Sequence, residues 1–183
     1  MRNAQMKRDT VEDAHQNKTT IADNPRQRER AVYEDLMPNN FMTDAAVKLQ
    51  ALPATMAGIA VGSVNVLAGR LAGNKDARIT VGNNALQFEN GLMGKPSSAF
   101  TAGNAVLYGP GAHPDRPSTR RYDERATPVT LGDHEKGHTY QFRKPFFIPR
   151  YYGAEIIDGL RGRPNRYEVE ADDFGEESYR RRK

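Results

Sequence analysis

Residues 49–69 form a long stretch without a charged side chain, in a chain where 27% of the residues are charged. The stretch is rich in Ala, Gly, Val and Leu, and as a helix it is just long enough to cross a bilayer. Gly58 and Gly62 form a G-x-x-x-G pattern, extended backwards by Ala54, which lets two helices approach closely. Pro53 and several polar residues favour a buried helical hairpin or a connecting segment over contact with a membrane, which stays the alternative.

The two ends of the chain contrast with this stretch. Residues 1–30 are polar, so we expect a disordered or loosely helical arm, and they lack the apolar segment of a secretory signal. If the protein is exported, a specialised secretion system or membrane association has to replace that signal. Residues 177–183 are basic and predict a solvated tail, with no motif for a specific nucleic acid. Residues 31–176 are then left as one domain, in keeping with a length of 183 residues.

The middle of the chain predicts a small sheet. Residues 78–89 and 99–108 are β-rich runs interrupted by Gly-Asn turn residues. A short helix is expected over residues 31–37, ending before Pro38. Residues 109–125 contain three prolines and predict an exposed loop, followed by a short edge strand at 127–130. With the helices predicted below, the fold class is α+β.

The sequence His134-Glu-Lys-Gly-His138 follows directly. Residues four apart share one face of a helix, so His134 and His138 can both direct imidazole nitrogens at one cation, with Glu135 beside them. Thr130 and Asp133 have the spacing of a capping box, which places the helix start just before the first histidine. The chain has no cysteine, so a metal site here must use histidines and carboxylates.

A second helix is predicted about thirty residues further on, where Asn165 can cap a segment that carries Glu168 and Asp172 on one face. A carboxylate ligand followed four residues later by an aspartate suits a metal site, because the aspartate can hold a ligating histidine by its second N–H. Glu170 lies on a different face of this helix and is the alternative ligand. Glu168 is favoured because it alone has an aspartate at the four-residue offset.

These residues resemble the gluzincins, zinc peptidases with H-E-x-x-H on one helix and E-x-x-x-D on a later one. Over roughly residues 50–175 the chain is more closely similar to metallopeptidase domains of Rhs-type and other bacterial toxin or effector proteins. In those domains an H-E-x-G-H-T-x-Q helix is followed by an aromatic-proline segment, as in His134-Glu-Lys-Gly-His-Thr-Tyr-Gln141 and Lys144-Pro-Phe-Phe-Ile-Pro149 here. The segment Ala99–Tyr108 is also similar to the strand that precedes the motif in that group.

The resemblance implies a single zincin-like domain with a small sheet, the H-E-x-x-H helix and a C-terminal ligand helix. It implies that His134, His138 and Glu168 bind Zn²⁺, that Glu135 is the general base, and that Asp172 supports a ligand. The expected function is zinc-dependent hydrolysis of peptide bonds in a peptide or protein substrate, as a bacterial toxin or effector with an inhibitor or immunity protein as a further partner. A zinc amidase acting on peptidoglycan peptides and a non-catalytic metal-binding module are the alternatives.

Several other side chains near the motif have two interpretations. Gln141 lies on the ligand face, and we expect it to support the helix or the site. The aromatic and aliphatic residues after the motif are expected in the core rather than in a binding groove: Phe142, Phe146, Phe147, Ile148, Tyr151 and Tyr152. The oxyanion-stabilising group of a hydrolase stays open among Tyr140, Tyr151, Tyr152, Tyr167 and His113.

Overall fold

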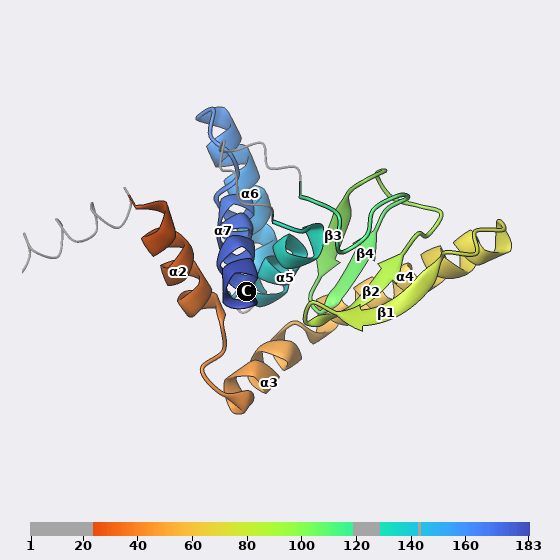
Figure 1. Cartoon of the computed structure of the whole chain (residues 1–183), viewed down its shortest axis with the longest axis horizontal. Helices are drawn as coiled ribbons and strands as arrows, with labels where there is room; N and C mark the ends of the chain where they lie inside the picture. Colours follow the sequence, from red (N-terminus) through yellow and green to blue (C-terminus); the bar gives the residue numbers. More distant parts are fainter. Residues whose placement is uncertain (1–23, 119–128, 143) are drawn as a thin grey trace, which may run out of the picture.

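The computed structural model describes residues 24–118, 129–142 and 144–183, which form a mixed α/β fold (Figure 1). One layer is a four-stranded sheet with a long helix lying across one of its faces, and the other part is a group of helices beside the sheet. The α+β class is therefore confirmed. In chain order the elements are α2 (Pro25–Leu36), α3 (Phe41–Gln50), α4 (Leu52–Leu71), β1 (Arg78–Gly82), β2 (Ala85–Glu89), β3 (Ala99–Ala102), β4 (Ala105–Tyr108), α5 (Leu131–Gln141), α6 (Phe147–Leu160) and α7 (Arg166–Arg181).

The sheet consists of two hairpins, as the two predicted β runs require, with strand order β1-β2-β4-β3. Asn83 and Asn84 have φ values of 49° and 61° in the first turn, and Gly103 has a φ of 60° in the second. Positive φ values at these positions match the turns that join twisted antiparallel strands. The hairpins meet through β2 and β4, which pair in parallel, and β3 is left as an edge strand.

The uncharged stretch forms the end of α3 and nearly all of α4, and α4 lies against the sheet rather than in a buried hairpin. The prediction that the G-x-x-x-G pattern brings two helices together is wrong, because Gly58 and Gly62 face strands. A Cβ atom on Gly58 would lie 2.7 Å from the Ala105 Cβ, and one on Gly62 would lie 2.4 Å from the Phe88 ring. The small residues thus let α4 approach a sheet, for the same steric reason that they allow close helix pairs.

The N-terminal helix is longer than predicted. It begins at Pro25 instead of residue 31, because Asn24 caps it and Pro25 occupies its first turn. Arg28 then donates two hydrogen bonds to Asp173 of α7, at 2.8 and 2.9 Å. Residues 25–30 are therefore part of the helical group, while residues 1–23 of the predicted arm lie outside the described residues.

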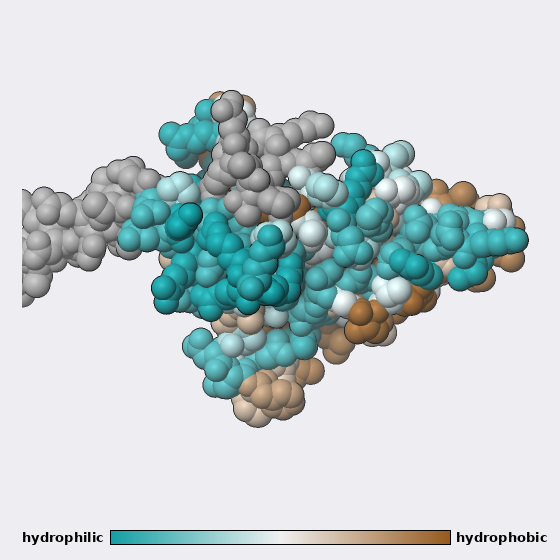
Figure 2. All heavy atoms as spheres, in the orientation of Figure 1, coloured by the Kyte–Doolittle hydropathy of each residue, from teal (hydrophilic) through white to brown (hydrophobic). Residues whose placement is uncertain are grey.

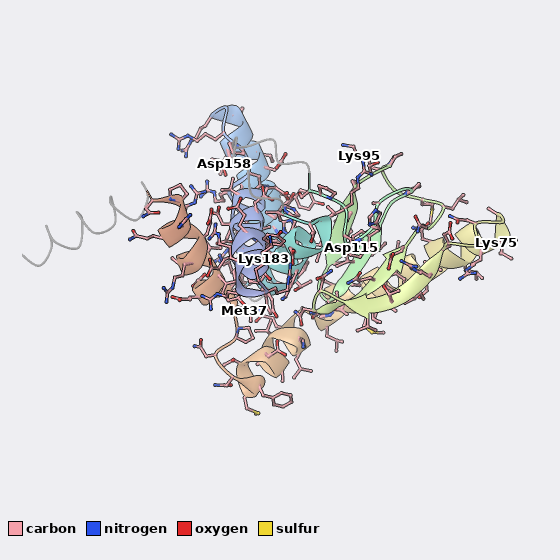
Figure 3. The ribbon with its side chains drawn as sticks, viewed as in Figure 1. Met37, Lys75, Lys95, Asp115, Asp158 and Lys183 are labelled. Atoms are coloured by element: carbon pink, nitrogen blue, oxygen red, sulfur yellow. The ribbon has the colours of Figure 1, made fainter. Side chains whose placement is uncertain are left out.

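The basic C-terminus is not a solvated tail. Residues 177–181 continue α7, and Arg182 follows as its C-cap. Arg182 donates to both carboxylate oxygens of the buried Asp133 on α5, at 2.5 Å each, and Arg180 pairs with the buried Glu29. The prediction failed because buried carboxylates on other helices, which a local sequence pattern does not reveal, supply partners for these arginines. Figure 3 shows charged side chains crowded where α2, α5 and α7 meet.

The segment before the motif helix pairs with the proline-rich loop, not with the sheet. Pro117 and Thr130 form an antiparallel bridge, and the Ser118 N–H donates to the Val129 carbonyl at 2.7 Å. The first two residues of the predicted edge strand at 127–130 lie outside the described residues. The pairing fixes the point at which the chain enters α5.

Candidate metal centre

The motif helix starts where the capping spacing predicts. The Asp133 N–H donates to the Thr130 hydroxyl at 3.1 Å, and that hydroxyl donates to the Asp133 carboxylate at 2.8 Å. Only the first bond is that of a regular capping box. In a regular box the Asp133 side chain would accept from the backbone N–H of Thr130, whereas here it accepts from the Thr130 hydroxyl. Helix α5 is buried along nearly its whole length, so its polar side chains must find partners inside the protein.

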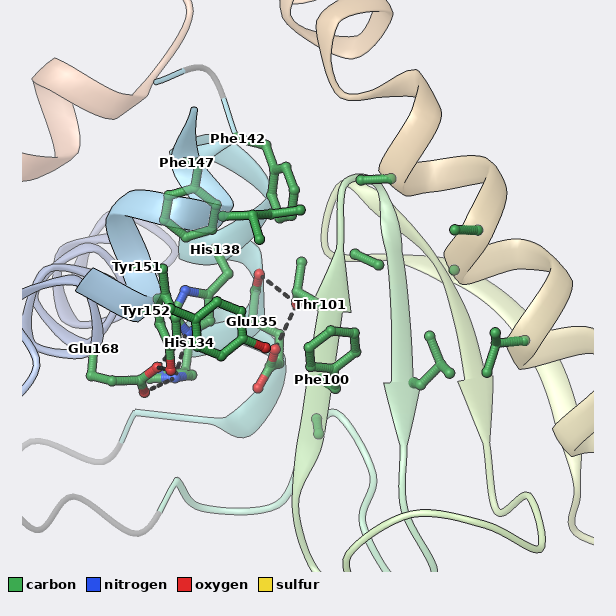
Figure 4. A pocket seen from close by; sticks show the side chains of 18 of the residues that line it. Phe100, Thr101, His134, Glu135, His138, Phe142, Phe147, Tyr151, Tyr152 and Glu168 are labelled. Carbon is green, nitrogen blue, oxygen red and sulfur yellow. Dashed lines mark hydrogen bonds and ion pairs between the residues drawn. The ribbon is translucent and has the colours of Figure 1, made fainter. Parts of the chain in front are cut away.

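His134, His138 and Glu168 lie together in the space between α5 and α7 (Figure 4). The Nε2 atoms of the two histidines are 3.1 Å apart. The Glu168 carboxylate lies 3.2 Å from His134 Nε2 through one oxygen and 3.4 Å from His138 Nε2 through the other. Both histidines are 8% exposed. These three side chains could hold a metal ion.

A glycine in the motif makes this approach of the two helices feasible. A Cβ atom on Gly137 would lie 2.9 Å from the Ala171 Cα and 3.0 Å from its carbonyl oxygen. Any side chain at residue 137 would therefore push α7 away from α5. Since Glu168 lies about one turn before Ala171 on α7 and Asp172 directly follows Ala171, their reach to the histidines depends on this close contact.

The second nitrogen of each histidine is held by an acceptor. His134 Nδ1 lies 2.8 Å from Asp172 Oδ1, and His138 Nδ1 lies 2.8 Å from Gln141 Oε1. The Gln141 amide nitrogen donates to the Tyr167 carbonyl and to Glu170, so its oxygen is the atom left to face the histidine. Both Nδ1 atoms are thus hydrogen-bond donors, and in a neutral ring Nε2 is then an unprotonated acceptor.

This arrangement brings the lone pairs of the two Nε2 atoms and of the Glu168 carboxylate close together. Two bare Nε2 atoms and a carboxylate within 3.4 Å of one another repel unless a cation lies among them. Burial by itself lowers the pKa of His134, but its hydrogen bonds to Asp172 and Glu168 outweigh burial and raise that pKa well above the ordinary value. For Glu168, burial raises the pKa, and the hydrogen bonds from both histidines overcome this and lower it. The cluster therefore favours bound positive charge.

The structure separates the two candidate glutamates on α7. Glu168 faces the histidines, whereas Glu170 accepts from Gln141 at 2.8 Å and pairs with Lys144 at 2.5 Å. Glu170 is thus connected to His138 only indirectly, because Gln141 hydrogen-bonds to both residues. Asp172 contacts the Nδ1 side of the His134 ring, as the four-residue offset from Glu168 predicted.

Glu135, the predicted general base, is 4% exposed and lines the cavity beside the histidines. Its Oε2 atom accepts a hydrogen bond of 2.6 Å from the hydroxyl of Thr101 on the edge strand β3. Sequence reasoning missed Thr101, since it precedes Glu135 by 34 residues and only the packing of α5 against β3 brings them together. Figure 4 shows this bond at the boundary between the helices and the sheet.

A cavity of about 620 Å³ opens beside the cluster, with walls from α4, β3, α5, α6 and α7. Phe142 and Phe147 line it and are buried, at 8% and 7% exposure, in agreement with a core position. The core prediction is wrong for Phe146, Ile148 and Tyr152, which are 78%, 48% and 57% exposed. The last two also line the cavity, because successive turns of α6 place them on its outer side.

The five candidates for stabilising an oxyanion separate into two groups. Tyr151 and Tyr152 line the cavity, and the Tyr151 hydroxyl donates to Glu168 at 2.5 Å. Tyr140, Tyr167 and His113 are not among the residues that line this cavity. The Tyr151 hydroxyl is already bonded to Glu168, a candidate metal ligand. Tyr152 is half-exposed and has no such bond to Glu168, so it is the cavity tyrosine whose hydroxyl is not committed to that carboxylate.

Comparison with protein-family models, with curated proteins and with solved structures finds no match for this chain. The chemistry of the site must accordingly be argued from its own residues.

Proposed function

We propose that this chain is a zinc-dependent hydrolase of peptide bonds. The observation that carries the proposal is the convergence of His134 Nε2, His138 Nε2 and a Glu168 oxygen at separations of 3.1 to 3.4 Å. Tetrahedral zinc with bonds of about 2.0–2.1 Å to nitrogen and oxygen holds neighbouring ligand atoms roughly 3.3 Å apart. The donor set fits, and three protein ligands are the number typical of catalytic rather than structural zinc.

The zincin-like fold is part of the same proposal. Its support is the order of the parts: a small sheet with an edge strand, a helix carrying His134, Glu135 and His138, and a later helix carrying Glu168. Asp172 and Gln141 orient the two rings, as carboxylates and amides commonly do behind metal-binding histidines.

A bound zinc ion supplies Lewis acidity and makes a water molecule acidic near neutral pH. In this proposal Glu135 accepts a proton and returns it to a leaving amine, and the support is that its side chain lines the same cavity as the histidines. Thr101 donates to one oxygen of this carboxylate and fixes its orientation. We expect the substrate to be a peptide or protein that enters the cavity beside β3.

The substitution Glu135→Gln tests the proposal. It preserves the size of the side chain and its bond to Thr101 but removes the basic oxygen, so hydrolysis of an unstructured protein substrate should fall about 10²- to 10⁴-fold. The zinc content, measured by mass spectrometry of the purified protein, should stay equal to that of the wild type. Glu34→Gln is the matched control, because Glu34 is exposed on α2 and pairs with Arg30.

Four outcomes would go against the proposal. A wild-type protein that binds no zinc would remove the cofactor, and zinc binding without turnover of any tested substrate would favour a metal-binding module. Equal turnover in Glu135→Gln and the wild type would remove the general base. Purified peptidoglycan belongs in the same assay, since cleavage of its peptides in place of the protein substrate would favour the amidase.

A further inference from the structure

The sheet face covered by α4 carries more apolar surface than the helix hides. Cross-strand partners point to the same face of a sheet. Ile79 pairs with Phe88, Phe88 with Leu107 and Leu107 with Phe100, so all four side chains lie on this face. Phe88 is buried against Gly62 of α4. Ile79 and Phe100 lie on the two outer strands and are 50% and 60% exposed. Apolar surface thus remains open on both sides of α4.

Helix α4 itself has an apolar outer side. Gly58 and Gly62 face the sheet, and the opposite side presents Val64, Leu67 and Leu71 at 60%, 59% and 82% exposure. Of the helices in the described ranges, α4 is the one long and apolar enough to cross a membrane, and 28% of its most apolar window is buried. A core helix of this composition would be mostly buried, so α4 differs from one.

Helix α6 continues the same property on the other side of the cavity. Ile148, Tyr152, Ile156 and Leu160 follow one another at helical offsets and are between 48% and 85% exposed. Two of them line the cavity together with the half-exposed Val61 of α4 and Phe100 of β3. Exposed apolar side chains from three elements therefore line the cavity, and Figure 4 shows two of them, Phe100 and Tyr152.

We call the exposed apolar side chains on these elements the apolar face: Met56, Val61, Val64, Leu67 and Leu71 of α4, Ile148, Tyr152, Ile156, Ile157 and Leu160 of α6, Ile79 and Val81 of β1, and Phe100 of β3. The surface over α2, α5 and α7 is different, and Figure 2 shows it as largely hydrophilic, with hydrophobic residues at its edges over α3 and α4. Val61, Phe100, Ile148 and Tyr152 line one cavity and so connect the exposed apolar side chains of α4, β3 and α6. Large exposed apolar patches usually mark interaction sites.

Basic residues stand at the ends of both helices. Arg70 and Lys75 lie at the far end of α4, as Figure 3 shows for Lys75, and Arg150, Arg161 and Arg163 lie in or just after α6. The exposed acidic residues in these segments, Asp76 and Glu155, are fewer. An apolar centre with basic ends matches a lipid surface that carries negative headgroups.

We propose that the apolar face docks on an anionic phospholipid bilayer, with α4 and α6 in the plane of the interface and the cavity mouth opening towards the lipid. Helix α4 does not cross the bilayer in this arrangement, because Gly58, Gly62 and Gly69 hold it against the sheet. The docking surface is independent of the chemistry of the site. If the proposed hydrolase activity holds, its substrates are peptide segments at a membrane surface.

Vesicle co-sedimentation tests the docking. The wild-type chain should sediment with vesicles that mix phosphatidylglycerol and phosphatidylcholine, and much less with phosphatidylcholine alone. The double variant Val64→Glu and Leu67→Glu should bind the mixed vesicles at least tenfold more weakly. Gln27→Glu with Ala31→Glu is the matched control, because both residues are exposed on α2, which packs against α7. This control should bind like the wild type.

The other outcomes separate docking from catalysis. His138→Ala should lose zinc yet keep vesicle binding, so a failure of the metal site leaves the docking result readable. Zinc content of the α4 double variant, equal to the wild type, shows that its fold is intact. Equal vesicle binding by the double variant and the wild type would overturn the proposal. A wild-type dimer in light scattering that the double variant abolishes would overturn it too, since a second copy would then cover the face.

Discussion

Helix α7 uses buried carboxylates in two different ways. Near its start, Glu168 faces His134 and His138, and within the described residues no lysine or arginine lies within ion-pair distance of it. One turn later, the buried Asp173 receives two hydrogen bonds from the Arg28 guanidinium of α2. Carboxylates of α7 therefore contact imidazoles on one side of the helix and the permanently charged guanidinium of Arg28 on the other.

The difference separates a candidate metal site from an ion pair that joins two helices. Arg28 is charged at every relevant pH, so the chain itself supplies the cation that Asp173 needs. At Glu168 the positive charge must arrive as a proton on a histidine or as a metal ion. A protein that only needed to join α5 and α7 could use an arginine there, as it does at the Asp133–Arg182 pair. The absence of such a partner among the described residues is what makes Glu168 a candidate ligand.

The largest effect should come from His138→Ala. Removing one of three ligands should lower zinc affinity by more than about 100-fold, and the zinc content should fall from about one ion per chain to nearly none. His113→Ala is the control, because His113 is exposed in the proline-rich loop. Mass spectrometry of the metal content would decide, and full zinc occupancy in His138→Ala would break the distinction between the two sides of α7.

Asp173→Asn should affect stability and leave the metal untouched. It leaves the half-exposed Arg28 without its carboxylate partner, so we expect the free energy of unfolding to drop by about 2 kcal/mol in urea titrations. The stability gained on adding zinc, about 2.7 kcal/mol at a zinc concentration 100 times the Kd, should be preserved. Glu168→Gln should show the reverse, with most of the zinc-dependent gain lost. If both variants lost the zinc-dependent stability to the same degree, the Arg28–Asp173 pair and the metal site would have to act as one unit.

Much of the site could be predicted because it depends on periodicity. The four-residue spacing puts His134 and His138 on one face of α5, and the same spacing distinguishes Glu168 with Asp172 from Glu170. The strands followed from β-rich runs with Asn and Gly at the turns. Such rules describe which residues share a face of one element, and they apply before any tertiary contact is known.

What faces each element could not be predicted in the same way. The contact of Thr101 with Glu135 joins residues 34 apart, and that of Arg182 with Asp133 joins residues 49 apart. The G-x-x-x-G pattern correctly indicated a close approach but not its partner, since a flat strand surface and a second helix both require small residues. The apolar outer side of α4 also has no unique sequence signature, because a buried helix has the same composition.

Asp172→Asn should give an intermediate effect. An asparagine can still accept from His134 Nδ1 but no longer provides negative charge behind the ring, so zinc affinity should fall about 10- to 100-fold. Competition with a fluorescent chelator would measure the affinity. Glu170→Gln is the control on the same helix, because Glu170 contacts Gln141 and Lys144 and does not contact a histidine in the hydrogen bonds described above. A larger loss in Glu170→Gln than in Asp172→Asn would mean that His138, through Gln141, depends more on its support than His134 does.

The smallest effect is expected for Tyr151→Phe. The hydroxyl donates to Glu168 at 2.5 Å, and its removal takes away one neutral donor from an oxygen that also faces His138. The cost should be about 1 kcal/mol, or roughly a fivefold loss of zinc affinity, because the carboxylate keeps its other partners. Tyr152→Phe tests the alternative role on the neighbouring residue: it should leave zinc affinity unchanged and lower turnover only if that hydroxyl contacts the substrate. A loss of zinc affinity in Tyr151→Phe as large as that in Asp172→Asn would place Tyr151 among the groups that hold the ligand in position.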